Sequence, residues 1–282
     1  MQVVDVISKT ACELGEGPLW HPTRQQFFWF DILGKRLLTV VDGAEQEWVF
    51  DDYVSAAGWV DDTTLIIASA VALWTFDITT GTRTHLVDLE ADNAVTRSND
   101  GRADPWGGFW IGTMGINAEP NAGAIYRYYR GELRQLYPDI TISNSICFAP
   151  DRACAYYTDT DTGLLMRQPL NSDDGWPVGT PDVLLDLSSE DFGIDGSVVD
   201  MDGNIWNAQW GASRVACYAP DGTLLRSVEI PAEQATCPAF CGPDLNQLYV
   251  TSAANGGKPA PAGQTFAISM DVIGQKEHQV IL

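Results

Sequence analysis

The sequence is poor in basic residues and in histidine. It has 16 Lys and Arg residues against 38 Asp and Glu residues, a formal net charge of −22, and only three histidines, which lie far apart in the chain. Nucleic-acid binding needs a basic surface to meet the phosphates, so this charge argues against that class of protein, and it also disfavours anionic membranes. We therefore expect no nucleic-acid or membrane partner, and a site built on several imidazoles is disfavoured.

The sequence also lacks long apolar runs and paired cysteine motifs. No stretch of about 18 apolar residues is present, so we expect no membrane span. The first residues lack the basic start and apolar centre of a signal peptide, which predicts a cytoplasmic protein. None of the six cysteines forms Cys-x-x-Cys, so we expect free buried thiols. A disulfide between Cys147 and Cys154, which flank one turn, is the alternative.

Several common catalytic motifs are absent as well. The chain has no Gly-x-Ser-x-Gly elbow, phosphate loop, dinucleotide fingerprint or His-Glu-x-x-His. The segment 159–163 (DTDTG) is similar to the start of a calcium loop but lacks the glycine and the distal glutamate in register. We therefore interpret this segment as a turn.

What the chain does contain is one short pattern repeated six times. In each copy an apolar run precedes a turn rich in Pro, Asp and Gly, and a second apolar run follows, which is typical of a strand, a hairpin turn and a strand. One turn residue marks each copy, and successive markers are 39, 43, 46, 50 and 43 residues apart: Pro22, Asp61, Asp104, Pro150, Asp200 and Pro243.

A period near 45 residues is typical of a four-stranded propeller blade, and further short strands follow the pairs. The sequence therefore predicts an all-β fold, a six-bladed β-propeller with four antiparallel strands per blade, as a single domain over residues 1–282. Two β-sandwiches would give no reason for six evenly spaced copies.

The two ends of the chain supply a means of closing the ring. The short strand predicted at 3–7 has no hairpin partner nearby, whereas open sheet edges invite aggregation. We predict that it closes the last blade, beside a strand at 264–268. The Gly- and Pro-rich segment 255–263 is interpreted as a flexible surface loop.

Four polar residues occupy one phase of the repeat. Glu16 and Asn144 lie six residues before their turn markers, and Asn99 and Asp195 lie five residues before theirs. These positions start the innermost strands of four blades, so in a propeller they would meet at one end of the central channel. Taken singly, each residue is explained as a cap at a turn or strand start.

Carboxylates brought together on the axis repel each other, so either one is protonated or a cation lies between them. Glu, Asp and an amide supply only oxygen ligands, which suit a hard divalent cation and do not suit a structural zinc site of thiolates and imidazoles.

Five short motifs carry a resemblance to a known family. They are Leu14–Pro18 (LGEGP), Arg97–Gly101 (RSNDG), Gly112–Met114 (GTM), Ile142–Asn144 (ISN) and Asp195–Gly196 (DG). Together with PDL at 243–245 and LYVTSA at 248–253, they strongly resemble the senescence-marker-protein/gluconolactonase/regucalcin-like family, in order along essentially the whole chain.

The resemblance implies a six-bladed propeller with one catalytic divalent metal ion (Ca, Zn, Mn, Mg or Fe). By motif position it implies Glu16, Asn144 and Asp195 as metal ligands, and Arg97 and Asn99 as substrate contacts. Where some relatives carry a substrate-contacting Glu, this chain has Asn117, which leaves the sugar open. The usual Asn-Gly is Asn144-Ser145 here, and the usual Pro-Asp-Gly is Ile194-Asp195-Gly196, but neither change removes a ligand.

Many members of that family hydrolyse sugar lactones. We therefore expect a metal-dependent hydrolase that opens an aldonolactone of the gluconolactone, xylonolactone or arabinonolactone type, with Asp195 as the catalytic base. The expected partner is a small-molecule sugar lactone, and the expected assembly is a monomer or weak homodimer. Two alternatives stay open: a non-enzymatic calcium-binding or regulatory propeller, and a related esterase or phosphotriesterase.

Overall fold

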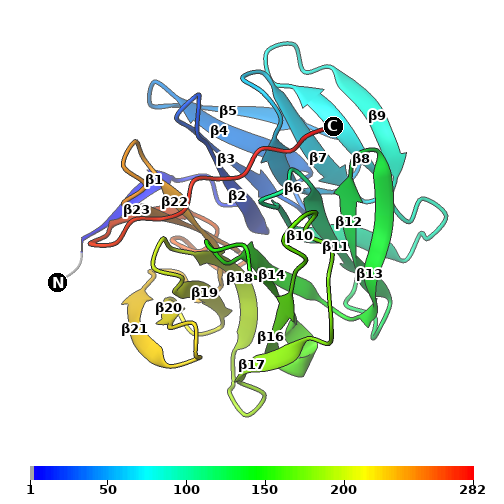
Figure 1. Cartoon of the computed structure of the whole chain (residues 1–282). Helices are drawn as coiled ribbons and strands as arrows, with labels where there is room; N and C mark the ends of the chain where they lie inside the picture. Colours follow the sequence, from blue (N-terminus) through cyan, green and yellow to red (C-terminus); the bar gives the residue numbers. More distant parts are fainter. Residues whose placement is uncertain (1–2) are drawn as a thin grey trace.

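The computed structural model describes residues 3–282 and folds them into six four-stranded antiparallel sheets, which stand around a common axis (Figure 1). Blade one holds β2 (Gly15–His21), β3 (Gln26–Asp31), β4 (Arg36–Val41) and β5 (Ala44–Val49). Blade two holds β6 (Val54–Trp59), β7 (Thr64–Ser69), β8 (Ala72–Asp77) and β9 (Arg83–Asp88). Blade three holds β10 (Thr96–Ala103), β11 (Phe109–Gly115), β12 (Gly123–Tyr129) and β13 (Glu132–Ile140).

The remaining blades follow the same plan, and blade six combines strands from both ends of the chain. Blade four holds β14 (Ser143–Phe148), β15 (Cys154–Asp159), β16 (Leu164–Pro169) and β17 (Asp182–Asp186). Blade five holds β18 (Gly193–Val199), β19 (Ile205–Trp210), β20 (Arg214–Tyr218) and β21 (Leu224–Glu229). Blade six holds β22 (Ala235–Cys241), β23 (Gln247–Ser252), β24 (Thr265–Ser269) and β1 (Val4–Ser8). The predicted six-bladed propeller and its closure by an N-terminal strand are confirmed.

The turn residues that revealed the repeat have a clear local task. In the hairpin between β10 and β11, Asp104 Oδ1 accepts the backbone N–H groups of Trp106 (2.9 Å) and Gly108 (3.0 Å). Asp200 accepts the N–H groups of Asp202 and Asn204 in the same way in blade five. Aspartate side chains that satisfy the turn backbone favour a tight hairpin at these points, which explains the aspartate markers of blades two, three and five.

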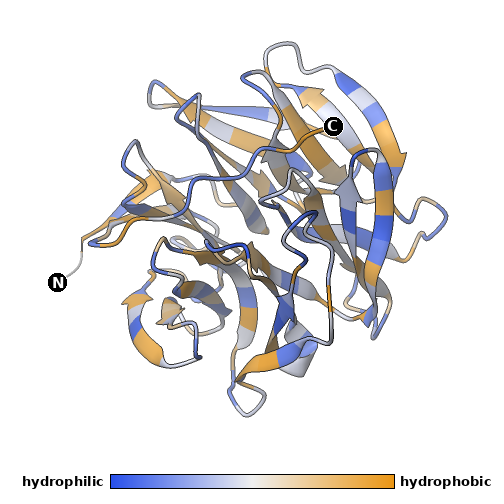
Figure 2. Cartoon of the chain, viewed as in Figure 1, coloured by the Kyte–Doolittle hydropathy of each residue, from blue (hydrophilic) through white to orange (hydrophobic). Residues whose placement is uncertain are grey.

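Apolar residues follow the strands, while the connecting turns are mostly hydrophilic (Figure 2). Innermost strands such as β2 and β6 are buried along their whole length, whereas the outer strand β5 is mostly exposed. The core is divided into six clusters, each packed between two neighbouring blades, and the last cluster joins blade six to blade one. Packing therefore runs without a break around the ring.

The chain segment after β24 crosses one end of the channel. Gln275 donates to the carbonyl groups of Phe148 and Val199, and the backbone N–H groups of Val280 and Ile281 donate to Trp59 and Gly107. These partners lie at or just beyond the final residues of the innermost strands, so the tail covers the channel end opposite the strand starts (Figure 1). The tail therefore leaves the end where the innermost strands begin uncovered.

The cysteines are buried and free. Cys147 lies opposite Tyr156 in the β14–β15 register rather than opposite Cys154, so the alternative disulfide is not formed. Segment 159–163 is a turn, with the short 3₁₀ helix η1 (Thr160–Thr162) at its centre and no calcium-loop geometry. Among residues 3–282, no helix is long and apolar enough to cross a membrane.

Candidate active site

Each innermost strand carries a register irregularity near its start. The breaks fall at Glu16/Leu19, Val54/Ala56, Ser98/Gly101, Asn144/Cys147, Ile194/Ser197 and Ala235/Pro238. An extra residue in one strand bends that strand and changes the direction of its side chains. In blades one, three, four and five the polar residue found by sequence lies at or inside this break, where its side chain leaves the regular alternation.

Five of the predicted site residues line one cavity of about 270 Å³ at the open end of the channel. Its polar lining consists of Glu16, Arg97, Asn99, Asn144, Thr160, Asp195 and Asn255. Its apolar lining consists of Leu14, Met114, Ile142 and Trp210. The cavity thus brings together residues from five blades. The most distant of these residues lie roughly 240 positions apart in the chain.

Asn117 is the predicted residue that does not line this cavity. It lies exposed in the turn after β11, and its Nδ2 donates to Glu119 Oε1 at 2.9 Å. Its assignment as a substrate contact stays a prediction.

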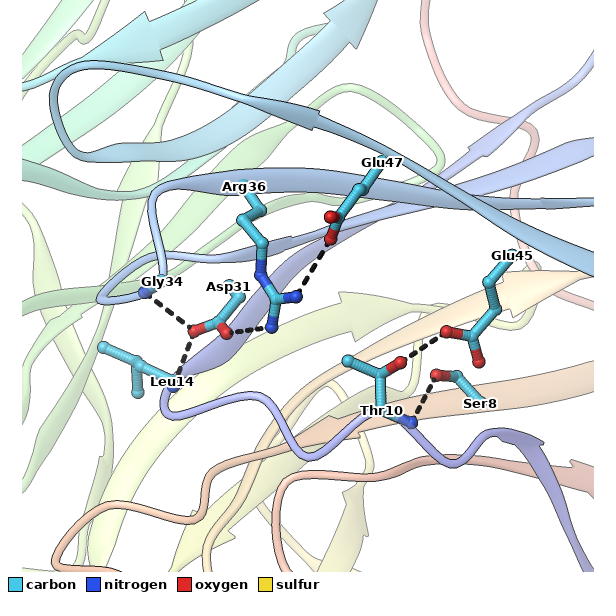
Figure 3. Close-up of polar contacts among 8 residues, drawn as sticks. All are labelled: Ser8, Thr10, Leu14, Asp31, Gly34, Arg36, Glu45 and Glu47. Atoms are coloured by element: carbon cyan, nitrogen blue, oxygen red, sulfur yellow. Dashed lines mark hydrogen bonds and ion pairs between the residues drawn. The ribbon is translucent and has the colours of Figure 1, made fainter.

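Two repeat-related aspartates fix the segments that lead into the cavity. Asp31, at the end of β3, accepts the backbone N–H groups of Leu14 and Gly34 at 3.1 Å and an Arg36 Nη2 at 2.8 Å (Figure 3). Asp159, at the end of β15, holds the backbone N–H groups of Thr141 and Ile142 at 2.9 Å each. Leu14 and Ile142 both line the cavity, so these carboxylates place its wall.

A hydrogen-bonded chain orders the polar side chains of blades three and four. Arg97 Nη1 donates to Asn99 Oδ1 at 2.8 Å, and Asn99 Nδ2 donates to the Ser143 carbonyl (2.8 Å) and to Asn144 Oδ1 (3.1 Å). On its other side, Asn144 Nδ2 donates to Thr160 Oγ1 at 2.9 Å. Every polar group of the two amides is therefore oriented by a neighbour.

The carboxyl groups of Glu16 and Asp195 are both buried, and they lie close enough for each to change the pKa of the other. Burial first and the nearby Asp100 carboxyl second raise the pKa of Glu16 to about 8, against the opposing effects of the Gly17 N–H, Asp195 and Arg97. Burial, then Glu16 and Asp100, raise the pKa of Asp195. Two acids this close share a proton unless a cation offsets their charge.

Among the described residues that line the cavity, Arg97 is the one with a cationic side chain. Burial lowers its pKa to about 10, so it stays charged at neutral pH, and within residues 3–282 its Nε has no hydrogen-bond partner. A buried donor without a partner is costly, so this N–H is an unmet hydrogen-bonding group on a residue of the cavity wall.

The donor set tests whether a metal ion fits. No group of three or more His, Cys, Asp or Glu side chains among residues 3–282 is arranged to hold one. Glu16 and Asp195 supply two carboxylates, and Asn144 presents an amide oxygen beside the same cavity. Two carboxylates and an amide fit a hard divalent cation whose remaining positions are filled by water, so the residues present are compatible with that group.

Sequence reasoning missed several residues of this site. Asp100, directly after Asn99, is buried beneath the carboxyl pair and accepts the Ile146 N–H at 2.7 Å. Thr160, Trp210 and Asn255 line the cavity but come from β-strand ends or connections that share no phase of the repeat. Asn255 belongs to the segment 255–263, which was interpreted as a flexible surface loop, although Ala262 of that segment is buried. Of these residues, only Asp100 could have been found from the sequence, because it is an acidic residue directly after Asn99, one of the four polar positions of the repeat.

The fold and this oxygen-lined channel mouth define a six-bladed β-propeller with a polar cavity at one end of its axis. Residues 14–254 match the SMP-30/Gluconolactonase/LRE-like region, so the chain belongs to that family. A relative from Rhizobium meliloti, named provisionally as a sugar lactone lactonase, is 42% identical over 279 residues, which cover 96% of this chain and 95% of the relative. The L-arabinolactonase of Azospirillum brasilense is 35% identical over 261 residues (89% and 84%).

One solved structure is similar over the whole chain. The protein from Agrobacterium tumefaciens described as a calcium-binding protein, regucalcin, aligns with a TM-score of 0.97 and 39% identity, covering 100% of this chain and 98% of that one. The family predicted from sequence is thereby confirmed.

Proposed function

We propose that this protein is a metal-dependent sugar lactonase, which opens the ring of an aldonolactone to the free sugar acid. One observation carries the proposal: an acidic pair, an oriented amide and a buried arginine with an unpartnered Nε surround one cavity at the end of the channel that the tail leaves uncovered. The names of the relatives, which include an L-arabinolactonase and a 6-deoxy-6-sulfogluconolactonase, support the same reaction class.

Glu16, Asn144 and Asp195 would hold the divalent cation, because they supply the oxygen donors of the cavity. When bound, a divalent cation supplies electrophilic stabilisation of the negative charge that develops on an attacked carbonyl oxygen. Its presence also offsets the repulsion between the two carboxylates, which allows both to be ionised at neutral pH.

Asp195 is the candidate general base. Its carboxylate takes a proton from the attacking water, whose oxygen forms the new bond to the lactone carbonyl carbon. When the bond from that carbon to the ring oxygen breaks, the same carboxyl group returns a proton to the ring oxygen, which leaves as a hydroxyl. The product is the open-chain hydroxy acid, and Asp195 is restored for the next turnover.

Arg97 and Asn99 hold and orient the substrate. The free Nε–H of Arg97 is a donor for a sugar hydroxyl or for the carboxylate that forms, and charge-assisted bonds of this kind are the stronger ones. The apolar side of the cavity, formed by Leu14, Met114, Ile142 and Trp210, is suited to the carbon–hydrogen face of a sugar ring.

The test compares hydrolysis of pentono- and hexonolactones, followed with a pH indicator, in EDTA-treated protein before and after addition of Ca²⁺, Zn²⁺, Mn²⁺ or Mg²⁺. We expect metal-dependent acid release, and we expect Asp195→Asn to lower kcat by about 10²–10⁴-fold. The matched control is Asp161→Asn, an exposed carboxyl in the neighbouring η1 turn.

Undiminished turnover by a folded Asp195→Asn protein contradicts the role given to Asp195. The description of the Agrobacterium tumefaciens neighbour as calcium-binding favours the regulatory alternative. Tight Ca²⁺ binding without hydrolysis of any sugar lactone, phosphotriester or simple ester would establish that alternative instead.

A further inference from the structure

Two hydroxyl groups of blade four hold two successive backbone carbonyls of blade five. Thr160 Oγ1 donates to the Ile194 carbonyl at 2.7 Å, and Ser145 Oγ donates to the Asp195 carbonyl at 2.5 Å. Both hydroxyls adjoin Asn144, one by chain sequence and one by a hydrogen bond. We propose that Ser145 and Thr160 are positioning residues that set the separation between the donor atoms of Asn144 and Asp195, which rests on the proposed function of these two side chains as metal ligands.

The Thr160 hydroxyl decides which way the Asn144 amide points. Its single proton is committed to the Ile194 carbonyl, so its oxygen acts as acceptor toward Asn144 Nδ2. The amide oxygen is consequently turned away from Thr160, toward Asn99 Nδ2 at 3.1 Å. A carbonyl oxygen has two lone pairs, so Asn144 Oδ1 keeps one for a cation.

Ser145 adopts a backbone conformation that favours glycine. Its φ is +60°, and a non-glycine residue held there costs about 1–3 kcal/mol. Gly17 holds the corresponding place after Glu16 with φ +53°, and a Cβ there would lie 2.1 Å from the Ser55 carbonyl oxygen. Glycine is thus obligatory in blade one, while blade four has room for a side chain.

The side chain that blade four admits is fully engaged. Besides the Asp195 carbonyl, Ser145 Oγ lies 2.9 Å from Ser197 Oγ and accepts a bond from Asn207 Nδ2 at 3.3 Å. Asn207 Nδ2 also donates to the Asp195 carbonyl at 3.0 Å. These contacts offset the conformational cost of the serine and attach it to the residue on which the proposed chemistry depends.

The experiment measures the dissociation constant of the ion that the wild-type protein binds, among Ca²⁺, Mn²⁺ and Zn²⁺, by isothermal titration calorimetry. Outer residues that orient metal ligands change metal affinity by about 10–100-fold, and we expect a loss of this size in Ser145→Gly and in Thr160→Val. Thr160→Ser keeps the hydroxyl and should retain the wild-type affinity. Thr162→Val is the control, because Thr162 Oγ1 bonds only to nearby backbone of its own blade: it donates to the Asp159 carbonyl at 2.7 Å and accepts the Leu164 N–H at 3.2 Å.

Thermal unfolding of the metal-free proteins separates positioning from simple stability. Ser145→Gly relieves the left-handed backbone but also removes the hydrogen bonds that offset its cost, so its metal-free Tm should stay close to that of the wild type while its metal affinity falls. Suppose that the wild-type protein binds metal and hydrolyses lactones. Unchanged metal affinity in both Ser145→Gly and Thr160→Val, or a lowered Tm with unchanged affinity in Ser145→Gly, then overturns the positioning role alone. A wild-type protein that binds none of the ions overturns it together with the proposed function.

Discussion

Glu16 is buried among other acids, and this makes the metal-free protein sensitive to pH. Its pKa is raised from 4.5 to about 8, first by burial and then by Asp100. Because the folded state binds this proton more tightly than the unfolded chain does, the folded state holds more protons between these two values. The free energy of unfolding contributed by this group therefore falls as the pH rises from about 4.5 to about 8.

The first prediction concerns EDTA-treated protein, unfolded with urea at pH 5.5 and at pH 8. We expect the wild type to lose more stability between these pH values than Glu16→Gln, whose side chain cannot ionise. Saturating metal should remove most of this difference, since bound cation favours the ionised carboxylates. Equal pH dependence in the two metal-free proteins would show that Glu16 does not carry the raised pKa.

Arg97 gives a second prediction at this scale. Removing the guanidinium in Arg97→Met deletes a buried charged donor, and hydrogen bonds to charged groups contribute about 1.5–3 kcal/mol. We expect KM for the lactone to rise roughly 10–100-fold with little change in metal affinity. Arg97→Lys keeps the charge but loses the planar guanidinium and its fixed set of N–H donors, so it should restore the KM only in part.

The control is Arg152→Met, since Arg152 is exposed at the opposite end of the channel, where it lines a hollow beside the tail. An Arg97→Met enzyme with wild-type KM would contradict the assignment of Arg97 to the substrate.

At the scale of the structural elements, the segments that lead into β2 and β14 are held by the carboxylates at the ends of β3 and β15. The third prediction is that Asp159→Ala lowers the free energy of unfolding by about 2 kcal/mol or more, because two buried or half-buried backbone N–H groups lose their acceptor. Asp161→Ala, in the same turn and exposed, should change it by less than about 0.5 kcal/mol. Urea denaturation of the two variants and the wild type measures these free energies, and an Asp159→Ala protein as stable as Asp161→Ala would contradict the prediction.

The elements themselves were largely predictable from sequence, because each of these hairpin turns carries an aspartate or a proline, two residue types that favour turns for local reasons. Asp104 and Asp200 illustrate this, since their hydrogen bonds stay within a few residues. The same regular spacing predicted that Glu16, Asn99, Asn144 and Asp195, which share one position in the repeat, would lie together, and all four line one cavity. A shared position in the repeat does not assign a chemical role, so the roles of these residues stay predictions.

The parts that escaped prediction depend on contacts between distant segments. Thr160 and Ser145 are ordinary hydroxyl residues in sequence, and only the packing of blade four on blade five gives them the carbonyls of Ile194 and Asp195 as partners. The tail after β24 has no strand pattern, so its path across the channel had no local signal. Trp210, the last residue of β19, and Asn255, in the connection after β23, reach the cavity from blades five and six.

At the scale of the whole molecule, the tail inserts a charge into the channel. Glu277 pairs with Arg102 of β10, and both side chains are buried. The fourth prediction is that Glu277→Gln lowers the free energy of unfolding by about 3–5 kcal/mol, because the arginine is left without its counter-charge. Lys276→Gln, an exposed neighbour, should have little effect.

The double replacement Arg102→Met with Glu277→Leu should recover much of this loss, because neither charge is then left unpaired. Lactone hydrolysis at 25 °C should persist in all of these proteins that fold, because the ion pair lies at the channel end away from the cavity. A Glu277→Gln protein as stable as wild type in guanidinium chloride would contradict the prediction.

Blade six is assembled from β22, β23 and β24 near one end of the chain and β1 near the other. During synthesis on the ribosome, β1 emerges before the other strands of the ring and has no sheet to join until Thr265–Ser269 has emerged, after blades one to five. The nascent protein therefore carries an unpaired strand edge while those five blades are made, and the cavity with its acidic pair can mature only after blade six is complete.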